Sequence, residues 1–236
     1  MGLTKKIISF DERAEMCHIA PFVLWVLVMC LPIPNQSLRY AFQSLFSGIV
    51  LCIASPWRFY KPLLWRHLPL GLLVGFVVFA FWVFPESPWL KQSSRTIYDL
   101  YATYAIHGTG TPQPTAGSSF SPENCGWFLS LVRLGGSALV IAVAEEYFWR
   151  GFLMRWLQGR PFIRIDPKRI SWGLLVVSSC LFGMEHSRWM AGTMAGFAYA
   201  LFYRRTGDLA AVALSHGVTN ALLGLYVLLT GAYQFW

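Results

Sequence analysis

The stretch WFLSLVRLGGSALVIAVAEEYFWRG, residues 127–151, decides what kind of fold this chain adopts. It begins as an apolar run long enough for a membrane-spanning helix, and it closes on two adjacent carboxylates, Glu145 and Glu146, followed by Arg150. A charged side chain costs roughly 2.5 to 3.5 kcal/mol at the centre of a membrane helix. Such a cluster is therefore expected to serve a function.

The rest of the chain has the composition of an integral membrane protein. Of its 236 residues, 56% are hydrophobic and only 13% are charged, which lies outside ordinary soluble domains. Several apolar runs approach the roughly 20 residues that a spanning helix needs. They are residues 20–31 extended by Ile33, 38–54, 68–84, 127–144, 170–184, 189–203 and 209–229. We predict an all-α, polytopic transmembrane helix bundle of about seven spans, within a range of six to eight.

The net charge of +8 reports membrane topology rather than nucleic-acid binding. If seven spans alternate, fourteen of the 19 Lys and Arg residues fall on one side. They are Lys5, Lys6, Arg13, Arg58, Lys61, Arg66, Arg150, Arg155, Arg160, Arg164, Lys168, Arg169, Arg204 and Arg205. By the positive-inside rule the N-terminus is then cytoplasmic and the C-terminus external, in what we expect to be a bacterial cytoplasmic membrane. The expected partner of this basic face is anionic lipid, and no nucleic acid is expected.

One polar interruption, residues 85–126, divides the chain. Its middle, residues 97–106, carries tyrosines at helical spacing, which favours a short amphipathic helix at the external interface; an inert ordered loop is the alternative. We predict a single integral membrane domain, 1–236. Its parts are three N-terminal spans in 1–84, an external loop in 85–126 and a catalytic four-helix core in 127–236. The N-terminal spans hold almost no ionisable groups, so we expect chemistry in the core.

Three residue pairs in this core share one spacing. The pairs are Glu146–Arg150, Phe182–His186 and His216–Asn220. Four residues separate the members of each pair, so both lie on one helical face, about 6 Å apart along the axis. An ion pair with Arg150 within the helix accounts for Glu146. Glu145 projects about 100° away from Glu146 and has no partner in its own helix.

Glu145 is therefore the residue on which we expect the chemistry to depend. A buried lone carboxylate can act as a general base or acid if a water molecule reaches it. His186, His216 and Asn220 would supply an orienting imidazole and hydrogen-bond donors for a developing oxyanion. Each of these three also has a structural explanation, a histidine bound to a backbone carbonyl or an asparagine that joins two helices. Together the four groups predict a hydrolytic site.

The position of His186 in the sequence is difficult to reconcile with a site at Glu145. On straight helices it lies on the order of 10 Å from Glu145 along the membrane normal. Tilted or short helices must close that gap, and residues 184–188 could break the helix where the backbone lines a polar cavity. Glu185 is an additional acid, and it either tunes the imidazole of His186 or pairs with Arg188 at the surface.

These residues resemble the motifs of a known family. EEYFWR at 145–150, FGMEH at 182–186 and HGVTN at 216–220 are similar to the EExxxR, FxxxH and HxxxN motifs of the CPBP family, the type II CAAX prenyl endoproteases and bacteriocin-processing or immunity proteins. The resemblance covers about residues 131–222. It implies an intramembrane endopeptidase that cleaves near the terminus of a membrane-anchored protein or peptide. Size and topology suggest the exosortase-associated CAAX protease-related subgroup. A prenylated protein is the less favoured substrate.

The resemblance also implies a role for each residue. The catalytic residues would be Glu145, His186, His216 and Asn220, and the supporting residues Glu146, Arg150 and Phe182. Glu145 and His186 would activate the water, and the other two catalytic residues would stabilise the oxyanion. No cofactor is expected. Zinc bound by Glu145, His186 and His216 is the alternative, ranked lower because the chain has no HExxH helix and asparagine is a poor zinc ligand.

Two other classes of function stay open. A non-catalytic family member would bind a peptide or neutralise a partner, as immunity proteins do. A transporter would use Glu145 and the histidines as a proton relay. Intact motifs favour the protease over the immunity-type protein, and the lack of repeated halves with paired broken helices disfavours the transporter.

Overall fold

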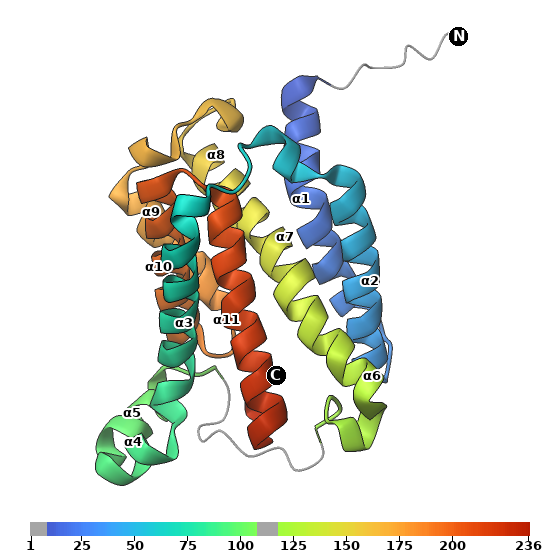
Figure 1. Cartoon of the computed structure of the whole chain (residues 1–236), viewed down its shortest axis with the longest axis vertical. Coiled ribbons are helices and arrows are strands. Elements are labelled where there is room, and N and C mark those ends of the chain that lie inside the picture. The colour runs from blue at the N-terminus through green and yellow to red at the C-terminus, as the bar shows by residue number, and fades with distance from the viewer. Residues whose placement is uncertain (1–8, 108–117) are drawn as a thin grey trace.

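The seven predicted apolar runs each fall on a helix of the bundle (Figure 1). The structure, a computed structural model, describes residues 9–107 and 118–236, and no strand occurs in these two ranges. The α-helices of the bundle are α1 (Phe10–Met29), α2 (Gln36–Ala54), α3 (Leu68–Val83), α6 (Pro122–Gly135), α7 (Ala142–Glu146), α8 (Met154–Gln158), α9 (Trp172–Met184), α10 (Trp189–Thr206) and α11 (Leu209–Thr230). The segments α6, α7 and α8 follow one another within one long helix, which has a kink at Gly126. The predicted all-α membrane bundle is confirmed.

Four helices in the described part of the chain are long and apolar enough to cross a membrane, judged by length and composition. They are Gln36–Phe59, Trp65–Glu86, Pro122–Gln158 and Leu209–Thr230. Helix α9 is apolar but has only 13 residues, and α1 opens with the charged stretch DERAE. Short 3-10 turns extend or connect these helices at Pro56–Phe59, Trp65–His67, Phe84–Glu86, Phe162–Arg164, Pro167–Arg169 and Tyr233–Phe235.

The helix ends follow from local side-chain chemistry. Ser9 and Glu12 form a capping box at the start of α1, each side chain accepting a hydrogen bond from the other's backbone N–H. Gly207 ends α10 with φ at +70°, a conformation that favours glycine. Asp208 then caps α11 by accepting from the Ala211 N–H at 3.0 Å. This two-residue turn reverses the chain between α10 and α11.

The helix that holds the fourth predicted span continues beyond residue 144 and ends at Gln158. Two π-helical segments, η4 (Gly136–Ile141) and η5 (Tyr147–Leu153), interrupt its α-helical pattern. The short α-helical segment between them holds Glu145 and Glu146. π-Helical turns are frequent at functional sites because they redirect the side chains around them. The two carboxylates therefore lie on the one regular turn between two altered ones.

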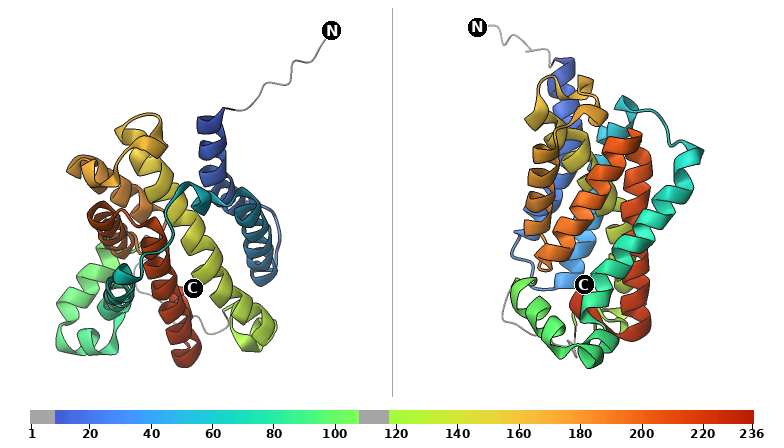
Figure 2. Two further views of the ribbon diagram at one scale, coloured as in Figure 1. Left: turned by 45° about the horizontal axis from the view of Figure 1, so that its top comes forward. Right: turned by 90° about the vertical axis from the view of Figure 1, so that its left-hand side faces the viewer.

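Helix α11 and the α6–α8 helix lie between the α1–α2 pair on one side and the α9–α10 pair on the other (Figures 1 and 2). Glycines allow the close contacts of α11. A Cβ added to Gly75 of α3 would lie 2.6 Å from the Ser215 carbonyl oxygen, and one added to Gly217 would lie 2.7 Å from the Ala138 carbonyl oxygen. Gly135, by contrast, has no heavy atom of the described structure within 4 Å of such a Cβ.

The polar interruption holds two short helices, α4 (Pro88–Ser93) and α5 (Arg95–Tyr104). Helix α5 confirms the helix predicted at residues 97–106. Its last residue accepts a hydrogen bond at its carbonyl oxygen from the Trp189 indole, 2.8 Å away. Residues 108–117, which belong to the predicted external loop, lie outside the described residues. A hydrogen bond thus joins the polar interruption to the first residue of α10.

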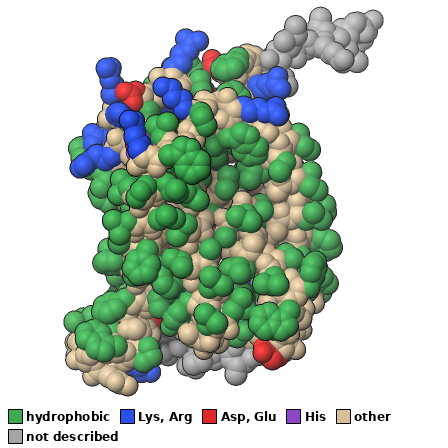
Figure 3. All heavy atoms as spheres, in the orientation of Figure 1, with side chains coloured by type: hydrophobic (Ala, Val, Ile, Leu, Met, Phe, Trp, Pro, Cys, Tyr) green, Lys and Arg blue, Asp and Glu red, His purple; other side chains and the backbone are tan. Residues whose placement is uncertain are grey.

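Basic side chains gather at the end of the bundle where α1 begins, above a surface that is mostly hydrophobic on the face shown (Figure 3). Arg204 and Arg205 occupy the last turn of α10 at that end. Lys5 and Lys6, which entered the topology prediction, lie outside the described residues. The assignment of this end to the cytoplasm stays a prediction.

Replacing Gly75 by alanine is expected to destabilise the bundle, because the new Cβ would clash with the Ser215 carbonyl oxygen. Overpacking of this kind costs about 1–3 kcal/mol, so the melting temperature in detergent should fall. Gly135→Ala is the matched control, since its Cβ meets no described heavy atom within 4 Å. Equal melting temperatures for the two variants would contradict the close packing of α3 on α11.

Candidate functional site

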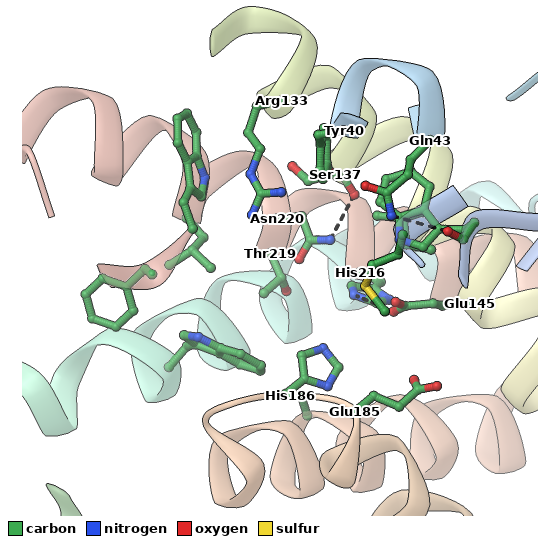
Figure 4. A pocket seen from close by; sticks show the side chains of 18 of the residues that line it. Tyr40, Gln43, Arg133, Ser137, Glu145, Glu185, His186, His216, Thr219 and Asn220 are labelled. Carbon is green, nitrogen blue, oxygen red and sulfur yellow. Dashed lines mark hydrogen bonds and ion pairs between the residues drawn. The ribbon is translucent and has the colours of Figure 1, made fainter. Parts of the chain in front are cut away.

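A pocket of about 430 Å³ lies between the two halves of the bundle (Figure 4). Its wall includes all four residues predicted to be catalytic, Glu145, His186, His216 and Asn220, together with Phe182. The other predicted site residues, Glu146 and Arg150, are buried against this wall and do not line the pocket. Three separate stretches of sequence thus meet at one cavity.

Glu146 and Arg150 form the predicted ion pair within the helix, with Arg150 Nη1 donating to Glu146 Oε1 at 3.0 Å. Both side chains are buried, with 0% and 2% of their surface exposed. Arg150 Nη2 donates to the Gly196 carbonyl oxygen of α10 at 3.0 Å. The same Glu146 oxygen accepts from His216 Nδ1 at 2.9 Å. Glu146 therefore neutralises the arginine and orients the histidine, and the sequence indicated only the first of these contacts.

The bond to Glu146 directs the other nitrogen of His216 toward Glu145. His216 Nε2 lies 3.7 Å from Glu145 Oε2, which is longer than a hydrogen bond. Tyr199 stacks on the imidazole at 4.9 Å between ring centroids and holds its plane. The Glu145 side chain is 13% exposed, whereas that of Glu146 is fully buried. Glu145 is thus the carboxylate that faces the pocket.

A break between two helices brings His186 to the pocket. Helix α9 ends at Met184 and α10 begins at Trp189, so the predicted interruption is present. His186 Nδ1 bonds to the Phe182 carbonyl oxygen at 2.9 Å. A carbonyl oxygen only accepts, so Nδ1 carries a proton and the neutral ring keeps a lone pair on Nε2. His186 and Glu145 line the same pocket, but no hydrogen bond or ion pair joins them in the described structure.

Asn220 lies one turn beyond His216 on α11. Its Nδ2 donates to the Ser137 carbonyl oxygen of η4 at 2.9 Å, the dashed contact in Figure 4. This bond is the interhelical role considered for the asparagine. An amide nitrogen carries two hydrogens, so the second one is left for the pocket that Asn220 lines.

Phe182 packs against the charged and imidazole groups, as the resemblance implied. The Arg150 guanidinium lies 4.3 Å from the centroid of its ring, within the range of a cation–π contact. The rings of His186 and His216 lie 4.8 and 5.8 Å away. Phe182 therefore separates Arg150 from the pocket while it contacts both histidines.

Glu185 does not pair with Arg188, so that predicted alternative is wrong. Its Oε2 accepts from the Trp149 indole at 3.1 Å, and Arg188 pairs with Glu86 instead. Burial raises the pKa of the Glu185 carboxyl, which lies in the connection between α9 and α10, to about 7, and the bond from Trp149 limits the rise. This carboxyl lines the same pocket as His186.

The N-terminal helices contribute more to the pocket than the sequence indicated. Their lining residues are Trp25, Met29, Gln36, Arg39, Tyr40, Gln43 and Trp82. Gln43 was the available signal, because it is a polar residue inside an apolar run. It is buried, and its Nε2 donates to the Trp25 carbonyl oxygen at 3.2 Å. The walls of the site therefore come from both halves of the chain.

The donors of the alternative zinc site are suitable by chemistry but are not grouped. Both histidines use Nδ1 for a carboxylate or carbonyl oxygen, and Nε2 of neither makes a hydrogen bond within the described residues, as a metal-binding histidine requires. Yet within the described residues no three His, Cys, Asp or Glu side chains are placed to hold one metal ion. The arrangement would have to close around a metal before it could bind one.

Residues 127–222 match the family model described as type II CAAX prenyl endopeptidase Rce1-like. This segment contains all seven predicted site residues and places the recognised motifs in that family. The match concerns the family in general, and membership of the exosortase-associated subgroup stays a prediction. No curated protein and no solved structure matches the chain.

Glu146→Gln is expected to destabilise the protein by about 3–5 kcal/mol, because the Arg150 guanidinium would stay buried without its counter-charge. Unfolding in a titration with denaturing detergent, followed by circular dichroism, measures this loss. The double variant Glu146→Gln/Arg150→Gln should lose less than the sum of the two single variants, since the pair is coupled. Strictly additive losses would show that the ion pair contributes nothing.

Proposed function

We propose, from the premise that residues 127–222 belong to the Rce1-like family of type II CAAX prenyl endopeptidases, that this chain is an intramembrane endopeptidase. Its substrate would be a membrane-anchored protein or peptide, cleaved near its terminus. The observation that carries the proposal is the position of Glu145. This carboxylate has no partner in its own helix and faces a pocket shared with two histidines and an asparagine.

Water activation is assigned to Glu145 and His186. Glu145 takes a proton from a water molecule that is held at the free Nε2 of His186. The hydroxide attacks the carbonyl carbon of the scissile bond, and the carbonyl oxygen becomes an oxyanion. When the C–N bond breaks, the proton on Glu145 passes to the leaving amine nitrogen. One water is consumed, and the carboxylate is regenerated.

Stabilisation of the oxyanion is assigned to Asn220 and His216, which lie one turn apart on the same face of α11. The second amide hydrogen of Asn220 is not used by Ser137. Glu146 and Tyr199 fix the imidazole of His216 before substrate arrives, and the doubly protonated ring donates to the oxyanion from Nε2. Donors held in place in this way act strongly on developing charge in a site shielded from water.

Glu145→Gln is expected to lower the rate of peptide cleavage by about 10²–10⁴-fold, because the amide cannot accept the proton of the attacking water. Purified protein in lipid nanodiscs, incubated with a panel of membrane-anchored peptides and followed by mass spectrometry, measures the rate. Glu123→Gln is the matched control, an exposed glutamate at the start of α6. Cleavage that survives in Glu145→Gln would refute this mechanism.

A chelator experiment tests the zinc alternative. We expect the cleavage rate to be unchanged after dialysis against a strong chelator, because the proposal uses only the side chains of the chain and water. Loss of activity that is restored by zinc and by no other divalent ion would reverse the ranking. Metal analysis of the purified protein, compared with Glu145→Gln, gives the stoichiometry independently of activity.

A further inference from the structure

Arg133 is a cation in the pocket with no counter-charge among the described residues. Its guanidinium lies 4.1 Å from the ring centroid of Tyr40 and 4.3 Å from that of Phe120, with Trp236 at 5.9 Å. The Nε is buried and has no hydrogen-bond partner, and no carboxylate of the described residues pairs with the side chain. Aromatic rings offset only part of the cost of holding a guanidinium within an apolar bundle. The site is therefore incomplete without an anion.

The pocket is lined by charges of both signs. Arg133 and Arg39 line it together with Glu145 and Glu185. In Figure 4 the Arg133 guanidinium points toward Asn220, on the side away from Glu145. A peptide that carries one negative charge at its end would be oriented by this polarity, with the charge at Arg133.

The spacing between Arg133 and Glu145 limits the length of chain between them. Arg133 and Glu145 are twelve residues apart on one continuous helix, which is at most about 18 Å along its axis. No more than about five extended residues span that distance. A carboxylate bound at Arg133 would thus place a peptide bond within about five residues of the C-terminus beside Glu145.

We propose that Arg133 binds the free C-terminal carboxylate of the substrate and thereby sets where the chain is cut; this rests on the proposed function. The planar guanidinium forms two parallel hydrogen bonds with a carboxylate, and the flanking rings of Tyr40 and Phe120 hold its plane. The phosphate of an anionic lipid offers the same chemistry. The experiment below separates the two sources.

Binding is measured first, in the non-hydrolysing Glu145→Gln background and in nanodiscs of neutral lipid. The probes are an S-farnesylated and an N-palmitoylated decapeptide, each ending in three apolar residues and each made as a free acid and as a C-terminal amide. We expect at least one acid to bind tenfold or more tightly than its amide. The added substitution Arg133→Gln should abolish that preference, and Arg133→Lys should retain part of it. Arg205→Gln, an exposed arginine at the end of α10, should leave it unchanged.

Cleavage is measured second, with the otherwise unchanged protein. When one residue is added to the C-terminus of a cleaved peptide, we expect the cut to move by one residue, so that the released fragment keeps its length. A cut that stays fixed relative to the lipid anchor would overturn the proposal. So would equal binding of acid and amide, or a preference that disappears when phosphatidylglycerol replaces neutral lipid.

The two hypotheses fail in distinguishable ways. Equal cleavage of the free acid and the amide would refute the role of Arg133 and would still agree with the proposed endopeptidase activity. The opposite result is binding that prefers the free acid and depends on Arg133, with no cleavage by the unchanged protein. It would support the carboxylate site at Arg133 and refute the proposed hydrolysis. The melting temperatures of Arg133→Gln and Arg133→Lys show whether both variants are folded.

Discussion

One oxygen atom, Oε1 of Glu146, organises the site. It accepts from Arg150 in its own helix and from His216 across the bundle. Through the second hydrogen bond of Arg150, the same ion pair reaches the backbone of α10. The long helix, α10 and α11 are therefore held together by one buried charge pair. A buried ion pair adds little net stability but imposes strict geometry, and here it leaves Glu145 as the carboxylate that faces the pocket.

The backbone arrangement allows this geometry. Glycines at Gly75 and Gly217 bring α3 and the long helix to within backbone contact of α11. The π-helical turn η4 presents the Ser137 carbonyl to Asn220. These features fix α11 on two sides, so its polar residues have little freedom to move apart. The pocket is consequently formed by rigid elements, the arrangement in which preorganised hydrogen bonds are most effective.

The sequence predicted what depends on local spacing and on composition. Apolar runs gave the helices, and the four-residue spacing gave the ion pair of Glu146 with Arg150. The contacts of Glu185 could not be predicted, because its partner Trp149 lies 36 residues away and is no different in type from the other tryptophans of the chain. Charge counting placed fourteen basic residues on the cytoplasmic side and left Arg133 outside that group, without indicating any role for it. Its position in the pocket depends on rings from Tyr40 and Phe120, which no spacing rule connects with it.

The connection between α9 and α10 is secured from outside the pocket. Arg188 pairs with Glu86, 102 residues earlier, and Arg188 Nη1 donates to the Gln234 carbonyl oxygen near the end of the chain at 2.7 Å. Contacts of such long sequence separation form late in folding, because closing a long loop precedes any gain from the contact. The connection that holds His186 is therefore positioned by two contacts outside the pocket, one before α4 and one after α11.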